Sequence, residues 1–285
     1  MDAVQSQWLD ALMLLDRVSV AMTAAIADAV GESGATNQGV QVLYWLHDAP
    51  ELSQSDVVLR LDADRAQVSR LLTTLQRRGL VERRVDPQHP RARTLRITRQ
   101  GRAGIRRYED AMASALLEQA DTIRGLLWLL GVQREPTTPT PARTVVEHMA
   151  VAGQRFTGGM APNAVKHGFG GPENGRVLRV IGSRGMVRPT EIADALGVRL
   201  PRVSTATAVL EGRGLITRSH PPGVDRRTVL LELTPRGRTA VLGTIEAFRE
   251  HAHVVVDPFV EALWVEPATA AGPRDLVGAS GSAAQ

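Results

Sequence analysis

Cysteine is absent from the 285 residues, which excludes disulfides, thiolate metal sites, cysteine nucleophiles and thiol redox switches. Aromatic residues are scarce at 4%, and no apolar run approaches the roughly 18 residues that a membrane-spanning helix needs. No basic segment followed by an apolar stretch is found at the start, so we expect no secretory signal, no membrane partner and a cytoplasmic location. With 43% hydrophobic and 22% charged residues, the rest of the composition is that of an ordinary globular protein.

Lysine is nearly absent as well, since Lys166 is the only one among 34 basic residues, and the arginines are concentrated in two stretches. The stretch from Arg65 to Arg102 contains eleven arginines and two acidic residues, which gives it a net charge of +9. The stretch from Arg199 to Arg238 contains eight arginines and three acidic residues, which gives it a net charge of +5. Because the whole chain carries only +4, the remainder is acidic. Two basic stretches on an acidic remainder indicate a nucleic-acid-binding protein, although two solvated charged faces would give the same counts.

The chain contains an internal repeat whose spacing is 135 residues and lengthens to 136 towards its end. The pairs at a spacing of 135 include Val42 and Val177, Leu61 and Leu196, Val68 and Val203, Leu75 and Leu210, and Arg78-Gly79-Leu80 and Arg213-Gly214-Leu215. The pairs at a spacing of 136 include Leu95 and Leu231, Thr98 and Thr234, and Gly101-Arg102 and Gly237-Arg238. Chance does not keep register over so long a stretch, so we expect two copies of one fold.

The repeat sets the expected domain boundaries. Copy one covers residues 1–134 and copy two covers residues 142–266. Residues 135–141 include three prolines and no apolar periodicity, which predicts a stiff, extended linker. Residues 267–285 are rich in alanine, glycine and serine, and we expect a disordered tail there.

Each copy shows helical periodicity followed by a hairpin and further helices. In copy one we expect helices over 9–30, around 42–46, over 54–61 capped by Ser53, over 65–78 capped by Asp64, and over 101–120 and 122–130. Strands are expected over 80–84 and 94–98. Copy two repeats these elements with helices over 190–196 and 201–213 and strands over 215–218 and 228–233. The predicted fold class is mainly α with small β-hairpin wings.

A helix, a turn, a helix ending in Arg-Gly-Leu, and a basic hairpin ending in Leu-x-Leu/Ile-Thr-x-x-Gly-Arg occur in both copies. This order resembles the MarR family of winged-helix regulators. Copy two also has the wing signature Asp225-Arg226-Arg227, whereas copy one has His89-Pro90-Arg91 there. The resemblance implies winged helix-turn-helix units that bind double-stranded DNA and regulate transcription, as repressors in our interpretation.

Members of this family are ordinarily homodimers with intertwined terminal helices. Because one chain supplies both halves here, the resemblance implies a monomeric pseudo-dimer. Its helical, dimer-like hub would comprise residues 12–26, 105–130, 145–156 and 241–259. Since the two copies differ in sequence, we expect an asymmetric DNA operator.

The fourth helix of copy one has the pattern of a DNA-recognition helix. Its apolar residues, Val68, Leu71, Leu72 and Leu75, fall at helical spacing and are expected to face the core. Gln67 could pair with adenine and Arg70 with guanine in the major groove, although a merely solvated polar face is the alternative. The predicted DNA-binding residues of this helix are Arg65, Gln67, Ser69, Arg70, Thr73, Thr74 and Arg77.

The corresponding helix of copy two is poorer in hydrogen-bond donors. Arg202, Ser204 and Thr205 are the predicted DNA-binding residues there. In the hairpin of copy two, Arg226 and Arg227 are expected to enter a minor groove, braced by Asp225. Arg91 and Arg93 are the nearest substitutes in copy one.

Other functions have weaker support in the sequence. No catalytic constellation occurs in a recognisable motif, so we expect no enzyme activity, and we expect no cofactor. His251 and His253 are two residues apart and would diverge on a helix, so no metal site is expected. Trp45, Trp128 and Trp264 are interpreted as packing residues, although an aromatic ligand pocket near the hub would also use them. Two alternatives stay open: a small-molecule effector of unknown identity, and a protein-binding winged-helix antirepressor that no longer contacts DNA.

Overall fold

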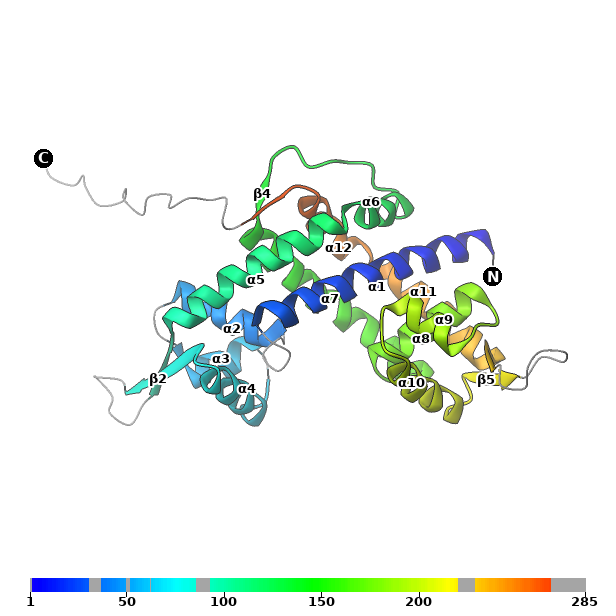
Figure 1. The fold of residues 1–285 in the computed structure, drawn as a ribbon, viewed down its shortest axis with the longest axis horizontal. Helices are drawn as coiled ribbons and strands as arrows, with labels where there is room; N and C mark the ends of the chain where they lie inside the picture. The colour runs from blue at the N-terminus through cyan, green and yellow to red at the C-terminus, as the bar shows by residue number, and fades with distance from the viewer. Residues whose placement is uncertain are drawn as a thin grey trace, which may run out of the picture. The chain divides into compact units, whose positions relative to one another are not determined.

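The computed structural model describes residues 2–30, 37–49, 52–61, 63–85, 93–219 and 229–267. These residues form long helices and three small sheets, which confirms the predicted fold class (Figure 1). The chain divides into two compact units, one made of residues 1–25, 115–138 and 147–264, and the other of residues 26–114, 139–146 and 265–285. Each unit therefore contains residues from both copies of the repeat.

A winged helix-turn-helix head, here called head one, lies in the second of these units. It consists of α2 (Asn37–Asp48), β1 (Leu52–Ser53), α3 (Gln54–Leu61), α4 (Arg65–Arg77), β2 (Val81–Val85) and β3 (Arg93–Ile97). The strands form an antiparallel sheet in the order β1-β3-β2, in which Leu95 pairs with both Leu52 and Arg83. Most apolar side chains of α2, α3 and α4 are buried beside this sheet, as the helical spacing predicts, whereas Leu59 of α3 is 82% exposed.

The other unit contains head two, which repeats this order. It consists of α8 (Pro172–Arg184), α9 (Pro189–Leu196), α10 (Leu200–Gly212), β5 (Ile216–Ser219) and β6 (Leu230–Leu233). The two strands are antiparallel, and a single bridge joins Val187 to Leu231. Val203, Ala206 and Leu210 of α10 are buried, as predicted.

The shared Thr-x-x-Gly-Arg sequence joins each wing to the helix that follows it. In head two, the Thr234 hydroxyl donates to the Gly214 carbonyl (2.7 Å) and accepts from the Gly237 amide (3.1 Å). A Cβ on Gly237 would lie 2.0 Å from the Leu215 carbonyl oxygen, so only glycine allows this approach. Thr98 and Gly101 make the same contacts in copy one. The motif is therefore a structural clamp.

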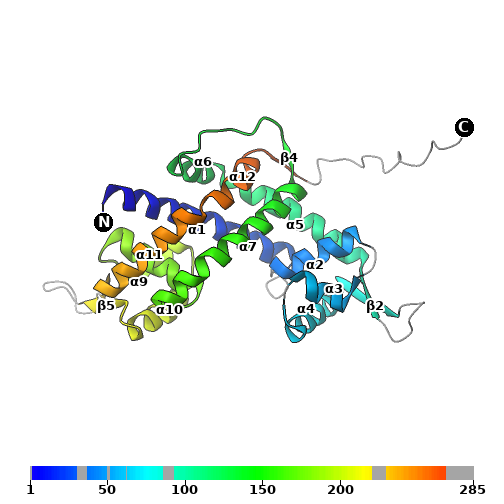
Figure 2. The same ribbon diagram turned by 180° about the vertical axis from the view of Figure 1, so that it is seen from behind.

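Further helices belong to the same compact unit as head two. They are α1 (Ala3–Val30) up to residue 25, α6 (Ala120–Leu129), α7 (Ala142–His167) from residue 147, α11 (Pro235–His251) and α12 (His253–Ala262) (Figure 2). Phe248 of α11 is fully buried, and the rings of Trp8 and Phe156 meet it edge-on at 5.7 and 5.8 Å. This aromatic cluster joins α1, α7 and α11, and thus both copies.

A buried ion pair fixes α1 of copy one against α8 of copy two. Nε and Nη2 of Arg179 donate to the Asp16 carboxylate at 2.8 and 2.6 Å, and Nε of Arg176 lies 3.4 Å from it. Arg179 is only 8% exposed. Tyr44 stands at the equivalent position of copy one, so this contact is specific to head two.

In the unit of head one, the first turn of α7 contacts α2. The Arg143 guanidinium of α7 lies 5.4 Å from the Tyr44 ring centre and 2.5 Å from Asp48. Tyr44 donates to Glu109 of α5 (Arg99–Glu118) at 3.1 Å. Strands β4 (Thr140–Pro141) and β7 (Val265–Glu266) pair in parallel, so the end of the predicted linker contributes to a short sheet.

Most expected elements are found with small shifts at their ends. The helix expected from residue 9 begins at Ala3, and the one expected over 145–156 extends over Ala142–His167. Two packing predictions are wrong, because Trp128 and Trp264 are 66% and 47% exposed. Leu71, expected in the core, is only half-buried because it lies at the edge of the buried face of α4. The tail from residue 268 onward lies outside the described residues.

Candidate nucleic-acid interface

The recognition helix of head one, α4, is fixed at both ends. The Asp64 carboxylate accepts a hydrogen bond from the Gln67 amide (2.7 Å), and Gly79, with φ +66°, follows its C-terminal end. Val68, Leu72 and Leu75 are fully buried. Burial of this face leaves the opposite face exposed and determines which side chains are available to a ligand.

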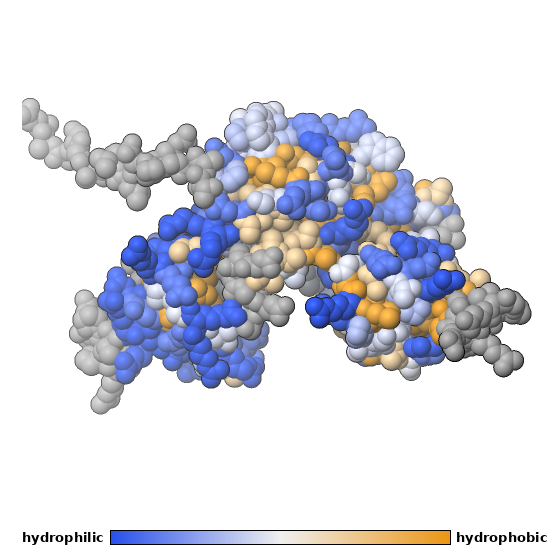
Figure 3. Space-filling view, in the orientation of Figure 1, coloured by the Kyte–Doolittle hydropathy of each residue, from blue (hydrophilic) through white to orange (hydrophobic). Residues whose placement is uncertain are grey.

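Arginines dominate the exposed face of α4. Arg65, Arg70 and Arg77 are exposed, and no hydrogen bond or ion pair holds their side chains among the described residues. Figure 3 shows a mainly hydrophilic surface over α3 and α4. The helix thus presents three exposed guanidinium groups for which the described residues supply no acceptor.

The other predicted residues of α4 are partly engaged. Gln67 is exposed, and its amide nitrogen donates to Gln38 of α2 (3.1 Å). The hydroxyls of Thr73 and Thr74 donate to the carbonyls one turn before them at 2.8 and 3.0 Å. Thr73, Thr74 and Ser69 are half-buried, so they line the sides of the exposed face rather than its centre.

The exposed face of α10 differs in chemistry from that of α4. Arg202, Ser204 and Thr205 are exposed there, as predicted. Arg202 lies 3.5 Å from Glu173 of α8, and the Thr205 hydroxyl donates to the Pro201 carbonyl (3.1 Å). No local pattern indicates the Arg202–Glu173 pair, because its members lie on different helices.

Arg199, at the N-cap of α10, is exposed, whereas three other arginines near this helix are bound to protein acceptors. Arg213 donates to the Gly168 carbonyl (2.5 Å), and Arg218 pairs with Glu211 (2.7 Å). Arg238 of α11 donates to the Leu233 carbonyl (2.9 Å). Head two therefore offers fewer available cations than head one in the described part of the chain.

The wing residues are only partly described. Arg93 is exposed at the start of β3. Arg91, Asp225, Arg226 and Arg227 lie outside the described residues, so their predicted contacts stay predictions. At the base of the first wing, Arg84 pairs with Glu82 (2.8 Å) and Arg83 donates to Gln54 (3.3 Å).

Two family-model matches coincide with the two heads. Both are to the MarR family, one over residues 33–92 and the other over residues 172–229. Both copies belong to the MarR family. The tandem arrangement predicted from the repeat is thereby confirmed. MarR-family members are transcriptional regulators rather than enzymes, in agreement with the prediction that the chain is not an enzyme.

One curated relative is YdgJ of Bacillus subtilis, an uncharacterized HTH-type transcriptional regulator. The chain is 37% identical to it over 73 residues, which are 26% of this MarR-family chain and 44% of YdgJ. The chain thus spans less than half the length of that relative.

Solved MarR-like structures resemble parts of the chain. YusO from Bacillus subtilis is 24% identical, with 39% of this chain and 77% of YusO covered and a TM-score of 0.34. An S. aureus MepR mutant bound to an oligodeoxyribonucleotide is 26% identical, with 39% and 79% covered and a TM-score of 0.31. Bordetella bronchiseptica BpsR, whose DNA binding is regulated by 6-hydroxynicotinic acid, is 25% identical, with 41% and 84% covered and a TM-score of 0.30. The family assignment rests on the sequence matches.

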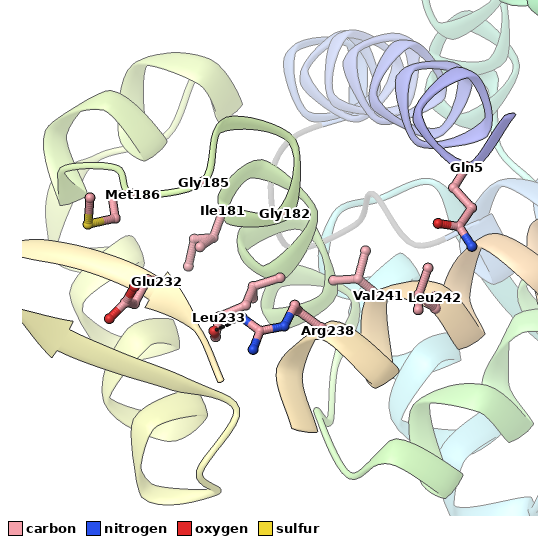
Figure 4. A pocket seen from close by; sticks show the side chains of 10 residues that line it. All are labelled: Gln5, Ile181, Gly182, Gly185, Met186, Glu232, Leu233, Arg238, Val241 and Leu242. Atoms are coloured by element: carbon pink, nitrogen blue, oxygen red, sulfur yellow. Dashed lines mark hydrogen bonds between the residues drawn. The ribbon is translucent and has the colours of Figure 1, made fainter. Parts of the chain in front are cut away.

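A cavity of about 300 Å³ lies beside head two in this MarR-family protein (Figure 4). Its walls come from α8, β6, α11 and the start of α1. Ile181, Leu233 and Val241 provide apolar surface, whereas Gln5 and Arg238 provide polar groups. Because apolar walls with a few polar groups suit a small organic molecule, the cavity is the candidate effector site.

Among the described residues, no group of three or more potential ligands could hold a metal ion, and no helix is long and apolar enough to cross a membrane. His251 ends α11 and His253 begins α12, and the His251 ring lies 2.8 Å from the Ala247 carbonyl oxygen.

Proposed function

We propose that this protein is a sequence-specific, double-stranded DNA-binding transcriptional regulator that acts as a repressor. In this proposal α4 and α10 enter major grooves, and the wings with Arg91, Arg93, Arg226 and Arg227 follow minor grooves. The observation that carries it is the set of three exposed arginines on α4, without acceptors among the described residues, within a MarR-family head. Arginine can pair with guanine through two hydrogen bonds or neutralise phosphate.

The chain acts as a monomeric pseudo-dimer in this proposal. Support comes from contacts between copies within each compact unit: Asp16 of copy one binds Arg179 of copy two, and Arg143 of copy two binds Asp48 of copy one. In a homodimer, contacts of this kind would join two chains. Here the hub expected over residues 12–26, 105–130, 145–156 and 241–259 would join the two halves of one chain.

The operator is asymmetric in this proposal, because the two recognition helices present different groups. Arg70 and Arg77 of α4 correspond to Thr205 and Gly212 of α10. Identical half-sites require identical reading heads, and these heads are not identical. Head one is therefore expected to contribute most of the hydrogen-bonded base readout.

Selection of binding sites from random duplex DNA, followed by footprinting, tests this function. We expect an enriched sequence with two unequal half-sites, both protected by one chain. Failure to enrich any sequence would contradict DNA binding, and a palindrome with equal information in both halves would contradict the asymmetric reading. A protein that binds no DNA but captures another regulator would fit the antirepressor alternative instead.

A small-molecule effector is the second part of the proposal, and the cavity beside head two supports it. A Cβ on Gly182 would lie 3.3 Å from Val241, so a larger side chain there would fill the cavity. A panel of small aromatic acids and amides should therefore include compounds that weaken DNA binding by the wild type and not by Gly182→Leu. The variant must bind the unliganded operator normally for this comparison. If the compounds weaken DNA binding by both proteins equally, this cavity is not the effector site.

A further inference from the structure

The two heads share one contact between their first and recognition helices, but its chemistry differs. In head one the contact is the uncharged hydrogen bond between Gln38 and Gln67. At a spacing of 135 residues, the same two positions of head two hold Glu173 and Arg202, which form an ion pair at 3.5 Å. Arg202 is the only cationic residue of α10, whereas α4 has three. The carboxylate of Glu173 therefore offsets the only positive charge of this helix.

Beside Arg202 and Ser204, the exposed face of α10 carries three side chains with methyl groups. Thr205, Ala208 and Val209 lie at i, i+3 and i+4 and are exposed, Val209 by 36%. The Thr205 hydroxyl donates within the helix, which leaves the methyl group for external contact. Figure 3 shows a surface over α10 in which apolar and polar residues alternate.

We propose that head two reads thymine methyl groups in the major groove through Thr205, Ala208 and Val209, while Glu173 keeps Arg202 from the phosphates. This inference rests on the proposed DNA-binding function and assigns a base to its second half-site. Thymine is the only base that presents a methyl group in the major groove, and small apolar side chains are its usual contacts. Guanine or cytosine would place donors and acceptors against a surface with few partners, which costs free energy.

These contacts imply that the two heads contribute differently to DNA binding. Head one supplies charge and hydrogen bonds through Arg65, Arg70 and Arg77. Apart from its wing, head two adds sequence preference with less electrostatic attraction than head one, because the one arginine of α10 is paired with Glu173. Glu173 is thus a positioning residue for specificity, acting through Arg202.

The half-site of head two can be located first. Because the chain has no cysteine, Thr217→Cys on β5 would provide a unique thiol for an iron chelate that cleaves nearby DNA. Each thymine in the cleaved half of the selected operator is then replaced by deoxyuridine, which lacks only the methyl group. We expect about three- to fivefold weaker binding for each contacted methyl, the factor that burial of one such group provides. In the half-site of head one, the same replacement should change affinity less than twofold.

Ala208→Gly provides the protein side of the same test. It should reduce the preference for thymine over deoxyuridine at one position and leave the others unchanged. Equal binding of thymine and deoxyuridine operators by the wild-type chain would overturn the inference while leaving the proposed function intact. If no sequence is enriched at all, both fail. Absence of cleavage from the tethered chelate, with head one still protecting DNA, would place head two on another partner and also overturn the inference.

The role of Glu173 has its own measurement, the dependence of affinity on salt. Glu173→Gln should free Arg202 for one more phosphate contact and steepen the salt slope by about 0.9. The control is Glu173→Gln with Arg202→Gln, which recreates the neutral pair of head one and should restore the wild-type slope. An unchanged slope in the single variant would show that the ion pair does not restrain Arg202.

Discussion

Arg70 is an exposed side chain of α4 with no hydrogen-bond or ion-pair partner among the described residues. Its neighbours Val68 and Leu72 are buried, so the helix is held in place independently of the guanidinium. Arg70→Ala is therefore expected to leave the fold intact and to weaken operator binding by about 1–3 kcal/mol. It should also relax preference at one base pair.

The measurement is binding-site selection with titration of individual sites. Arg227→Ala is the contrasting variant, because a wing arginine should lower affinity for most sequences about equally. Unchanged base preferences after Arg70→Ala would remove this residue from base readout.

His167 gives a pH-dependent contribution to stability. Burial, with a smaller contribution from Lys166, lowers the pKa of His167 below its ordinary value of 6.5, while Glu246 opposes the shift. The ring nitrogen Nε2 lies 3.2 Å from the Asn163 amide, and Asn163 also contacts Thr244 (3.0 Å). A histidine with a lowered pKa binds its proton first in the unfolded chain.

Stability from this histidine is therefore present above about pH 6.5 and falls as the pH drops below that value. Between pH 7.5 and pH 5.5, the melting temperature of His167→Gln should fall less than that of the wild type. Circular dichroism measures both melting temperatures. His253→Gln, at an exposed position of α12, is the matched control. Equal pH dependence of His167→Gln and the wild type would assign the effect to other groups.

At the scale of elements, the clamp between wing and helix is the most constrained feature. Gly237 lies where a Cβ would meet the Leu215 carbonyl at 2.0 Å, and backbone cannot yield as a flexible side chain can. Gly237→Ala should destabilise the chain by about 1–3 kcal/mol, the usual cost of overpacking. Gly153→Ala on α7 meets open space and should be neutral or stabilising.

Urea denaturation of both variants compares these effects directly. A Gly237→Ala variant as stable as the wild type would mean that α11 can move away from β5 at no cost. That result would also weaken the view that the Thr-x-x-Gly-Arg motif is primarily structural.

At the scale of the whole molecule, the Asp16–Arg179 pair joins the copies. Asp16→Ala should cost about 3–5 kcal/mol in urea denaturation, because it leaves a buried guanidinium with one partner fewer. Adding Arg179→Tyr, the residue of copy one at this position, removes the uncompensated charge and should recover part of the loss. No recovery would show that packing, rather than charge, causes the effect.

Contacts between copies within one chain also predict the oligomeric state. We expect one monomeric species in analytical ultracentrifugation at micromolar concentration, and one chain on each operator. A predominant dimer at that concentration would show that the helices pair between chains, which would contradict the fused-dimer proposal.

Local sequence determined the elements of both heads. Caps such as Asp64, glycines such as Gly79 and the spacing of Val68, Leu72 and Leu75 act over a few residues, so they can be read without tertiary information. The repeat at 135 residues added the tandem architecture and, with the motifs, the family. The exposed positions of Arg70, Arg202 and Thr205 followed from the same helical spacing.

Tertiary structure decided which of those exposed groups are available. The Arg202–Glu173 pair, the Asp16–Arg179 pair and the exposure of Trp128 depend on residues far apart in the chain, so no local pattern could reveal them. Hydrogen bonds and ion pairs between helices depend on how distant segments pack against one another. Local sequence patterns do not reveal that packing. The sequence alone determined two winged-helix heads of one family, and only the folded chain distinguished the exposed arginines of α4 from Arg202 of α10, which is paired with Glu173.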